Sequence, residues 1–263
     1  MAANTRRKAG GDLQRLPNRS GGPTGMTSMM RRLLGILAAV TLSLLAVINL
    51  ASAKEASQSC IDDAMIVFDA SGSMSGNEKL GIATTITRID EVRSALARVL
   101  PGAARHRRVG LITYGPGPYN QCNVELNLKP EPNAAKVIMR AVEALTPAGK
   151  TPLTSAVEQA AHVLDFRHKP GVVVVLTDGE ETCGGSPCDL GRQLHQEADQ
   201  LIVHVIALRT RNFSWTGEQS VLGIKCLAEE NGGLYVTAES QEELVSAFQE
   251  TLSCPMISSR AQP

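Results

Sequence analysis

Short, almost entirely apolar runs recur along the chain and alternate with longer amphipathic stretches. Runs of this kind are typical of strands that are buried on both faces of a sheet. They occupy residues 64–68, 109–114, 172–176 and 201–208, with a shorter candidate at 234–236. Residues 124–128 instead alternate apolar and polar positions after a Gly-Pro-Gly-Pro turn. This alternation predicts a short antiparallel edge strand that forms a hairpin with the second run.

The stretches between these runs have helical periodicity, and many of them begin after Asp, Thr, Pro or Ser and end at Pro or Gly. The predicted helices cover residues 89–100, 134–145, 153–166, 190–198, 219–230 and 242–252. A strand that regularly alternates with a helix indicates a parallel sheet with helices on both faces. The pattern therefore predicts an α/β fold, with a doubly wound, mostly parallel sheet and one antiparallel edge strand.

Composition and charge narrow the class of protein. With 43% hydrophobic residues and 26 residues of each charge sign, the chain is not a disordered polymer, a collagen-like repeat or a polytopic membrane protein. Residues 1–53 hold seven basic residues and one acidic residue, so the chain from Lys54 onward has a net charge of about −6. This mildly acidic part gives no electrostatic reason to expect a nucleic acid partner.

The beginning of the chain predicts export. Arg31 and Arg32 precede an apolar stretch at 33–50, and Ala51-Ser52-Ala53 is a small-x-small cleavage site. Residues 31–53 are therefore interpreted as a signal peptide, with secretion or periplasmic location after cleavage near Ala53 and Lys54. The alternative is an uncleaved anchor, which would place the protein at a membrane. Residues 1–30 form a basic extension, and the alternative is that translation starts later, at a methionine just before the basic pair. Residues 60–254 are predicted to form one domain, and residues 255–263 are predicted to form a tail.

All six cysteines follow the predicted cleavage site, where thiols can oxidise, so three disulfides are expected. Cys183 and Cys188 lie close enough in sequence to close a surface loop, and Cys60 and Cys254 flank the domain. Cys122 and Cys226 then remain as the third pair. Six cysteines allow fifteen connectivities, so this pairing is one hypothesis among them. A zinc site is disfavoured, because it would need closer paired spacings and nearby histidines.

Oxygen-bearing side chains follow two of the predicted buried strands. Asp69, Ser71 and Ser73 alternate directly after the first run, and Asp178 follows the run at 172–176. Ligands of open α/β sheets bind beyond the carboxyl ends of the strands, so these side chains are expected at one edge. Carboxylates and hydroxyls suit a hard divalent cation such as Mg²⁺, which keeps several water ligands. A helix cap and an ordinary turn are the simpler alternative for the first loop.

Three sequence segments, DASGSM, AGKTPLTSA and LTDGEE, closely resemble the von Willebrand factor type A domain with a complete metal-ion-dependent adhesion site. The resemblance runs from about Ile61 to Leu252. It implies five parallel strands, one antiparallel edge strand and a bound Mg²⁺ or Mn²⁺. By the same resemblance, the hydroxyls of Ser71, Ser73 and Thr151 would be ligands, and Asp69 and Asp178 would bind mainly through water.

The resemblance also implies a function: capture of a protein ligand whose exposed Asp or Glu carboxylate completes the shell of the cation. One alternative is an assembly subunit in which the ion only stabilises the fold, and a less favoured one is a metal-dependent hydrolase. Catalysis is not expected, because phosphatase-type chemistry at Asp69 usually needs a second aspartate where this chain has Ser71. No Walker phosphate-binding motif and no G-x-S-x-G motif is present in the sequence.

Two positions depart from the family pattern. Lys150 stands where many relatives have glycine, and it either attracts an acidic ligand or is a solvated bystander. The polar stretch at 75–87 is longer than expected before the first helix. It either borders the site and shapes the choice of ligand or is loop variation without a function, and the sequence favours neither. Pro152 is expected in the first turn of a helix, which would hold Thr151 at that helix's start.

Overall fold

The computed structural model describes residues 62–79, 82–83, 85–208 and 218–254, which lie within one compact unit, residues 57–263. The predicted signal peptide, the basic extension and the tail lie outside the described residues, and so does Cys60. None of the helices in the described part of the chain is long and apolar enough to cross a membrane.

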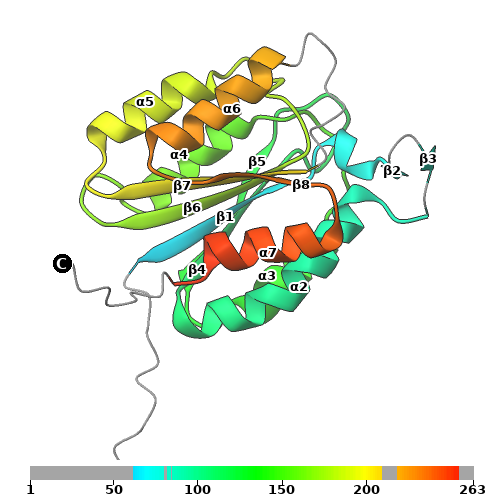
Figure 1. Ribbon diagram of the computed structural model, residues 1–263, viewed down its shortest axis with the longest axis horizontal. Coiled ribbons are helices and arrows are strands. Elements are labelled where there is room, and N and C mark those ends of the chain that lie inside the picture. The colour runs from blue at the N-terminus through cyan, green and yellow to red at the C-terminus, as the bar shows by residue number, and fades with distance from the viewer. Residues whose placement is uncertain (1–61, 80–81, 84, 209–217, 255–263) are drawn as a thin grey trace, which may run out of the picture. The chain divides into compact units, whose positions relative to one another are not determined.

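A six-stranded sheet runs through the middle of this unit (Figure 1). Its strand order is β5-β4-β1-β6-β7-β8, and every neighbouring pair except β4 and β5 is parallel. The strands are β1 (Asp63–Asp69), β4 (Val109–Tyr114), β5 (Val124–Glu131), β6 (Gly171–Thr177), β7 (Leu201–Leu208) and β8 (Tyr235–Ala238). The predicted fold class is confirmed, including the antiparallel edge strand β5.

Helices cover both faces of the sheet. Figure 1 shows α4, α5 and α6 on one face and α2, α3 and α7 on the other. Their bounds are α2 (Arg88–His106), α3 (Ala135–Glu143), α4 (Leu153–Val163), α5 (Pro187–Glu197), α6 (Glu218–Glu230) and α7 (Gln241–Leu252). The alternation of side chains along β1 explains why two layers are needed. Ile66 and Phe68 belong to the core beneath α2 and α7, whereas Met65 and Val67 belong to the core beneath α4 and α5.

Helix α2 is longer than predicted. The predicted end at Leu100 relies on Pro101, yet the helix continues through this proline to His106. Proline cannot donate a backbone hydrogen bond, but the following turn brings Ala103 and Ala104 into the core. Burial of these side chains outweighs the missing bond, so the hydrophobic pattern and not the proline sets the end of the helix.

Among the described residues, three short elements lie between β1 and α2. A 3₁₀ turn, η1 (Gly72–Ser75), follows β1, and the strands β2 (Glu78–Lys79) and β3 (Ile82–Ala83) pair antiparallel. The Thr87 side chain then caps α2 by accepting from the Asp90 backbone N–H. This insertion returns the chain to the sheet edge, so that α2 begins beside the loop that follows β1.

Candidate functional site

The two predicted acidic residues lie side by side at the carboxyl end of the sheet. Asp69 is the last residue of β1, and Asp178 directly follows β6, which is the neighbour of β1 in the sheet. The hydroxyls between them form a connected chain. The Ser71 and Ser73 Oγ atoms lie 3.0 Å apart, and Ser73 Oγ donates to Asp178 Oδ1 at 2.6 Å.

Asp69 is fully buried, and uncharged donors hold both of its oxygens. Oδ1 accepts from the Ser71 backbone N–H at 2.8 Å. Oδ2 accepts from the Tyr114 hydroxyl at 2.8 Å and from the Thr177 hydroxyl at 2.9 Å. Burial and the nearby charge of Asp178 raise the pKa of Asp69 to about 6, although the hydrogen bonds from Ser71 and Tyr114 oppose the shift.

Asp178 is held by a charged partner. Its side chain is fully buried, and Arg88 Nη1 lies 2.9 Å from Oδ2 in an ion pair. The same Nη1 donates to the Ser73 carbonyl at 3.1 Å. Burial raises the pKa of Asp178, while the Ser73 hydroxyl and the Arg88 guanidinium act in the opposite direction.

Thr151 lies in the loop before α4 and is 5% exposed. The loop is fixed on two sides by backbone contacts. Gly72 donates to the Gly149 carbonyl at 2.9 Å on one side, and Thr151 N–H donates to Thr182 Oγ1 at 2.8 Å on the other. Pro152 precedes the first helical residue as the N-cap, one position earlier than predicted. Thr151 is therefore set just before the helix, beside the serine loop.

A pocket of about 530 Å³ opens above these residues. The predicted hydroxyl ligands Ser71, Ser73 and Thr151 all line it, whereas Asp69 and Asp178 are not among its lining residues. The loops after β4 and β6 and the threonine loop complete the wall with Tyr119, Asn120, Lys150, Gly179, Glu180 and Thr182. The structure thus places the three hydroxyl-bearing residues in the pocket wall and keeps the two carboxylates behind it, buried.

The donor set fits a hard divalent cation. Hydroxyl and carboxylate oxygens are the ligands that Mg²⁺ and Mn²⁺ prefer. Both oxygens of each carboxylate already accept protein hydrogen bonds, so the acids suit contact through water, and the pocket hydroxyls suit direct contact. Among the described residues, no group of three or more His, Cys, Asp and Glu side chains is placed to hold a metal ion.

Sequence reasoning missed several residues that shape this site. Tyr114 and Thr177 are the last residues of β4 and β6, and both hydroxyls point to Asp69. The sequence carried a signal for them, because each is a hydroxyl-bearing residue at the end of a predicted strand, as Asp69 is. Gly115 has a φ of 75°, and a Cβ there would lie 2.6 Å from the Ser71 backbone, so only glycine lets the β4 end approach the serine loop.

The predicted pairing of Cys183 with Cys188 is wrong, because Cys183 is bonded to Cys122, with 6.0 Å between the Cα atoms. Cys122 lies in the loop between β4 and β5, and Cys183 lies in the loop after β6. Glu181 Oε1 accepts from the Cys183 backbone N–H and its Oε2 accepts from that of Thr154, so the Cys183 loop is tied to the start of α4. This disulfide links two loops that wall the pocket.

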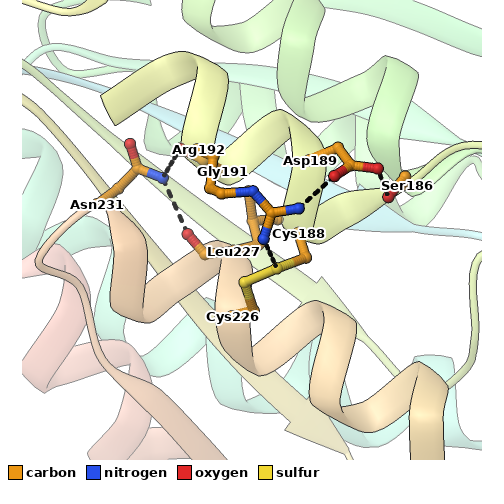
Figure 2. The surroundings of a disulfide bond; sticks show 8 residues. All are labelled: Ser186, Cys188, Asp189, Gly191, Arg192, Cys226, Leu227 and Asn231. Atoms are coloured by element: carbon orange, nitrogen blue, oxygen red, sulfur yellow. Dashed lines mark hydrogen bonds and ion pairs between the residues drawn. A yellow bond between two sulfur atoms is a disulfide. The ribbon is translucent and has the colours of Figure 1, made fainter. Parts of the chain in front are cut away.

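Cys188 is bonded to Cys226, and the predicted pair of Cys122 and Cys226 is therefore also wrong. Figure 2 shows this bond joining α5 to α6, with Asn231 Nδ2 donating to the carbonyls of Gly191 and Leu227 nearby. Because Cys188 lies on a helix, its side chain points to α6 and away from the preceding loop. The predicted pair of Cys60 and Cys254 includes Cys60, which lies outside the described residues. The two described disulfides fit an extracellular or periplasmic protein.

Two Bacillus subtilis proteins are similar to this chain. The uncharacterized protein YwmD is 27% identical over 230 residues, which are 82% of this chain and 96% of YwmD. The uncharacterized protein YwmC is 30% identical over 112 residues, which are 42% of this chain and 46% of YwmC. The likeness to YwmD therefore spans nearly the whole of that protein.

Solved structures share the fold at low sequence identity. The PilB minor pilin from Streptococcus sanguinis has a TM-score of 0.54 and 16% identity, over 74% of this chain and 61% of the pilin. The vWF domain of the type V pili tip protein Mfa5 from Porphyromonas gingivalis has a TM-score of 0.50 and 14% identity, over 72% and 93%. A von Willebrand factor type A structure from Catenulispora acidiphila has a TM-score of 0.52 and 16% identity, over 73% and 42%.

The family model described as von Willebrand factor type A domain matches residues 64–181. This range runs from β1 past β6 and includes all five predicted ligand residues. The overall fold of the described residues agrees with these structural neighbours at TM-scores of 0.50 to 0.54. The described residues therefore have the α/β fold of von Willebrand factor type A domains, and residues 64–181 match that family's model.

Proposed function

We propose that this exported domain is a non-enzymatic binding module that captures a protein ligand through a divalent cation, Mg²⁺ or Mn²⁺. Ser71, Ser73 and Thr151 would hold the cation, with Asp69 and Asp178 behind them. A bound cation would supply an open coordination position for an Asp or Glu carboxylate of the ligand. The observation that carries this proposal is that Ser71, Ser73 and Thr151, from two separate loops, line one pocket beside two buried carboxylates.

The rim of the pocket supports a protein ligand. The Tyr119 side chain is 84% exposed and stands at the pocket edge, and exposed tyrosines are favoured in protein interfaces. Lys150 belongs to the same wall and adds positive charge that suits an acidic partner. The fold likeness to a minor pilin and to a pilus tip domain is in keeping with a role in contacts between proteins.

The proposal is tested first by calorimetric titration of Mg²⁺ and Mn²⁺ into the secreted protein, purified oxidised and stripped with a chelator. We expect saturable binding to one site, with the affinity lost in Asp69→Ala and Thr151→Ala. Thr154→Ala, at the second residue of α4 and outside the predicted ligand set, is the matched control for the threonine change. A folded wild-type protein that binds neither ion would contradict the proposal.

The capture of a ligand is tested by a pull-down from the extracellular proteins of the source organism, once in the presence of Mg²⁺ and once in the presence of chelator. A partner retained only in Mg²⁺, and lost in a folded Asp69→Ala variant, supports capture through the ion. Ion binding with no ion-dependent partner favours the alternative in which the ion only stabilises an assembly subunit. Turnover that depends on Asp69 would favour the hydrolase instead.

A further inference from the structure

Arg88 is a cation placed next to the predicted ion site. It is the first residue of α2, and its Nη1 contacts both Asp178 Oδ2 at 2.9 Å and the Ser73 carbonyl at 3.1 Å. Asp178 is fully buried, while the Arg88 side chain keeps 25% of its surface exposed. The guanidinium therefore gives the buried carboxylate a counter-charge from within the protein.

The ion pair changes the charge of the site. Asp69 and Asp178 together carry two negative charges when ionised, which equals the charge of one divalent cation. Arg88 reduces this sum to one negative charge, so a bound divalent cation leaves the site with one excess positive charge. A nearby like charge weakens cation binding, and the excess charge strengthens attraction for an anion at the open position.

The segment between β1 and α2 places Arg88 beside the serine loop. The serine loop, the 3₁₀ turn and the β2–β3 hairpin occupy the residues between β1 and α2, and the chain then returns to the loop that follows β1. The Arg88 backbone N–H donates to the Gly76 carbonyl at 2.9 Å, which ties the first residue of α2 to the end of η1. The insertion thus has a consequence for the site, because it fixes the start of α2 against the serine loop.

We infer that Arg88 is a positioning residue that sets the order of binding at this site. It lowers the affinity for the cation alone and raises the affinity of the cation-bound site for an acidic ligand, so that ion and ligand bind cooperatively. Its ion pair with Asp178 also stabilises the ion-free domain. This inference rests on the proposed function and adds its regulation.

The test compares wild type with Arg88→Gln in the secreted, oxidised, metal-stripped protein. Removal of the positive charge is expected to tighten the Mg²⁺ dissociation constant about tenfold in calorimetry. The same change leaves buried Asp178 without its counter-charge, so the thermal midpoint in chelator is expected to fall by about 3–6 °C. A merely structural arginine would lower the midpoint without tightening Mg²⁺ binding.

Two matched variants control the comparison. Arg98→Gln removes one charge from the exposed face of α2 and is expected to leave the Mg²⁺ affinity unchanged. Arg88→Lys restores the charge at the same position and is expected to return the Mg²⁺ affinity toward that of wild type. If Arg88→Gln is too unstable to titrate, Arg88→Met keeps the aliphatic part of the side chain and takes its place.

The outcomes separate this inference from the proposed function. Unchanged or weaker Mg²⁺ binding in folded Arg88→Gln, with binding intact in wild type, overturns the inference and leaves the proposed function standing. If wild type, Arg88→Gln and Arg98→Gln are all folded and none binds Mg²⁺ or Mn²⁺, both are overturned.

Discussion

The ends of β1 and β6 each deliver an aspartate to the same site, but they hold it in different ways. Asp69 is surrounded by the uncharged donors Ser71 N–H, Tyr114 and Thr177, whereas Asp178 is ion-paired with Arg88. Burial raises the pKa of both carboxyls. Among the described residues, Asp69 therefore lacks a positively charged partner, which a bound cation would supply. The charge of Asp178 is already balanced by Arg88. Asp69 is therefore the acid whose charge gains most from an ion.

Asp69→Asn is expected to have the largest effect on ion binding. It removes the uncompensated charge but keeps the shape of the side chain, so Mg²⁺ affinity should fall by at least about a hundredfold. The ion-free domain should keep or gain stability at pH 7, because a buried charge near Asp178 is gone. Calorimetry and thermal unfolding in chelator measure the two effects. Unchanged Mg²⁺ affinity would show that Asp69 is not needed for the ion.

Asp178→Asn is expected to differ from Asp69→Asn in stability. It leaves the Arg88 guanidinium without its carboxylate, so the ion-free domain should lose on the order of 1–3 kcal/mol of unfolding free energy. Asp90→Asn is the control, because Asp90 pairs with Arg93 on the same helix but is about half exposed. Denaturant unfolding in chelator gives the comparison. Equal losses in the two variants would contradict a special role for the buried pair.

The contrast between these acids also shows how far the sequence could predict the site. Because strand ends of a parallel sheet share one edge, an apolar run followed by Asp was enough to place Asp69 and Asp178. Arg88 lies 90 residues from Asp178 and after a hairpin insertion, and nothing in its local sequence indicates where its guanidinium points. The placement of Arg88 depends on how the insertion folds, which the periodicity of the helices does not encode.

The disulfides show a similar limit. The sequence predicted oxidised cysteines, and the described pairs Cys122–Cys183 and Cys188–Cys226 agree with that chemistry. Short spacing favoured Cys183 with Cys188, but the start of α5 lies between them and sends their side chains toward different elements. The sequence separation of two cysteines limits the distance between them. It does not determine the direction in which a helix points each side chain, and this direction decides the pairing.

A pH series is expected to expose the raised pKa of Asp69. Between about pH 4 and pH 6 the native domain holds a proton on Asp69 that the unfolded chain has released. The unfolding free energy of the ion-free domain therefore falls as pH rises through this window, by on the order of 1–3 kcal/mol. Mg²⁺ competes with that proton, so its apparent affinity should weaken as pH falls below about 6.

His204 also changes the unfolding free energy in this pH range, so the experiment needs a control that contains His204. Burial lowers its pKa to about 4, so the unfolded chain is protonated at His204 where the native domain is not, and this contribution to stability rises with pH. The Asp69 contribution is therefore read as the difference between wild type and Asp69→Asn, since both contain His204. A difference that stays constant from pH 4 to pH 7 would contradict the raised pKa of Asp69.

Tyr114→Phe is expected to have the smallest effect and to test the uncharged shell of Asp69. It removes the hydroxyl that donates to Oδ2 at 2.8 Å, but Thr177 still donates to the same oxygen, so the loss of stability should be about 1 kcal/mol. Loss of this donor raises the pKa of Asp69 further, because the hydrogen bond favours the charged form. Mg²⁺ binding should therefore need a higher pH than in wild type.

Tyr119→Phe makes the same chemical change on a tyrosine that is 84% exposed and should leave the pH profile of Mg²⁺ binding unchanged. A profile that shifts equally in both variants would mean that the buried hydroxyl does not tune Asp69, and that the contrast between the two acids rests on Arg88 and burial.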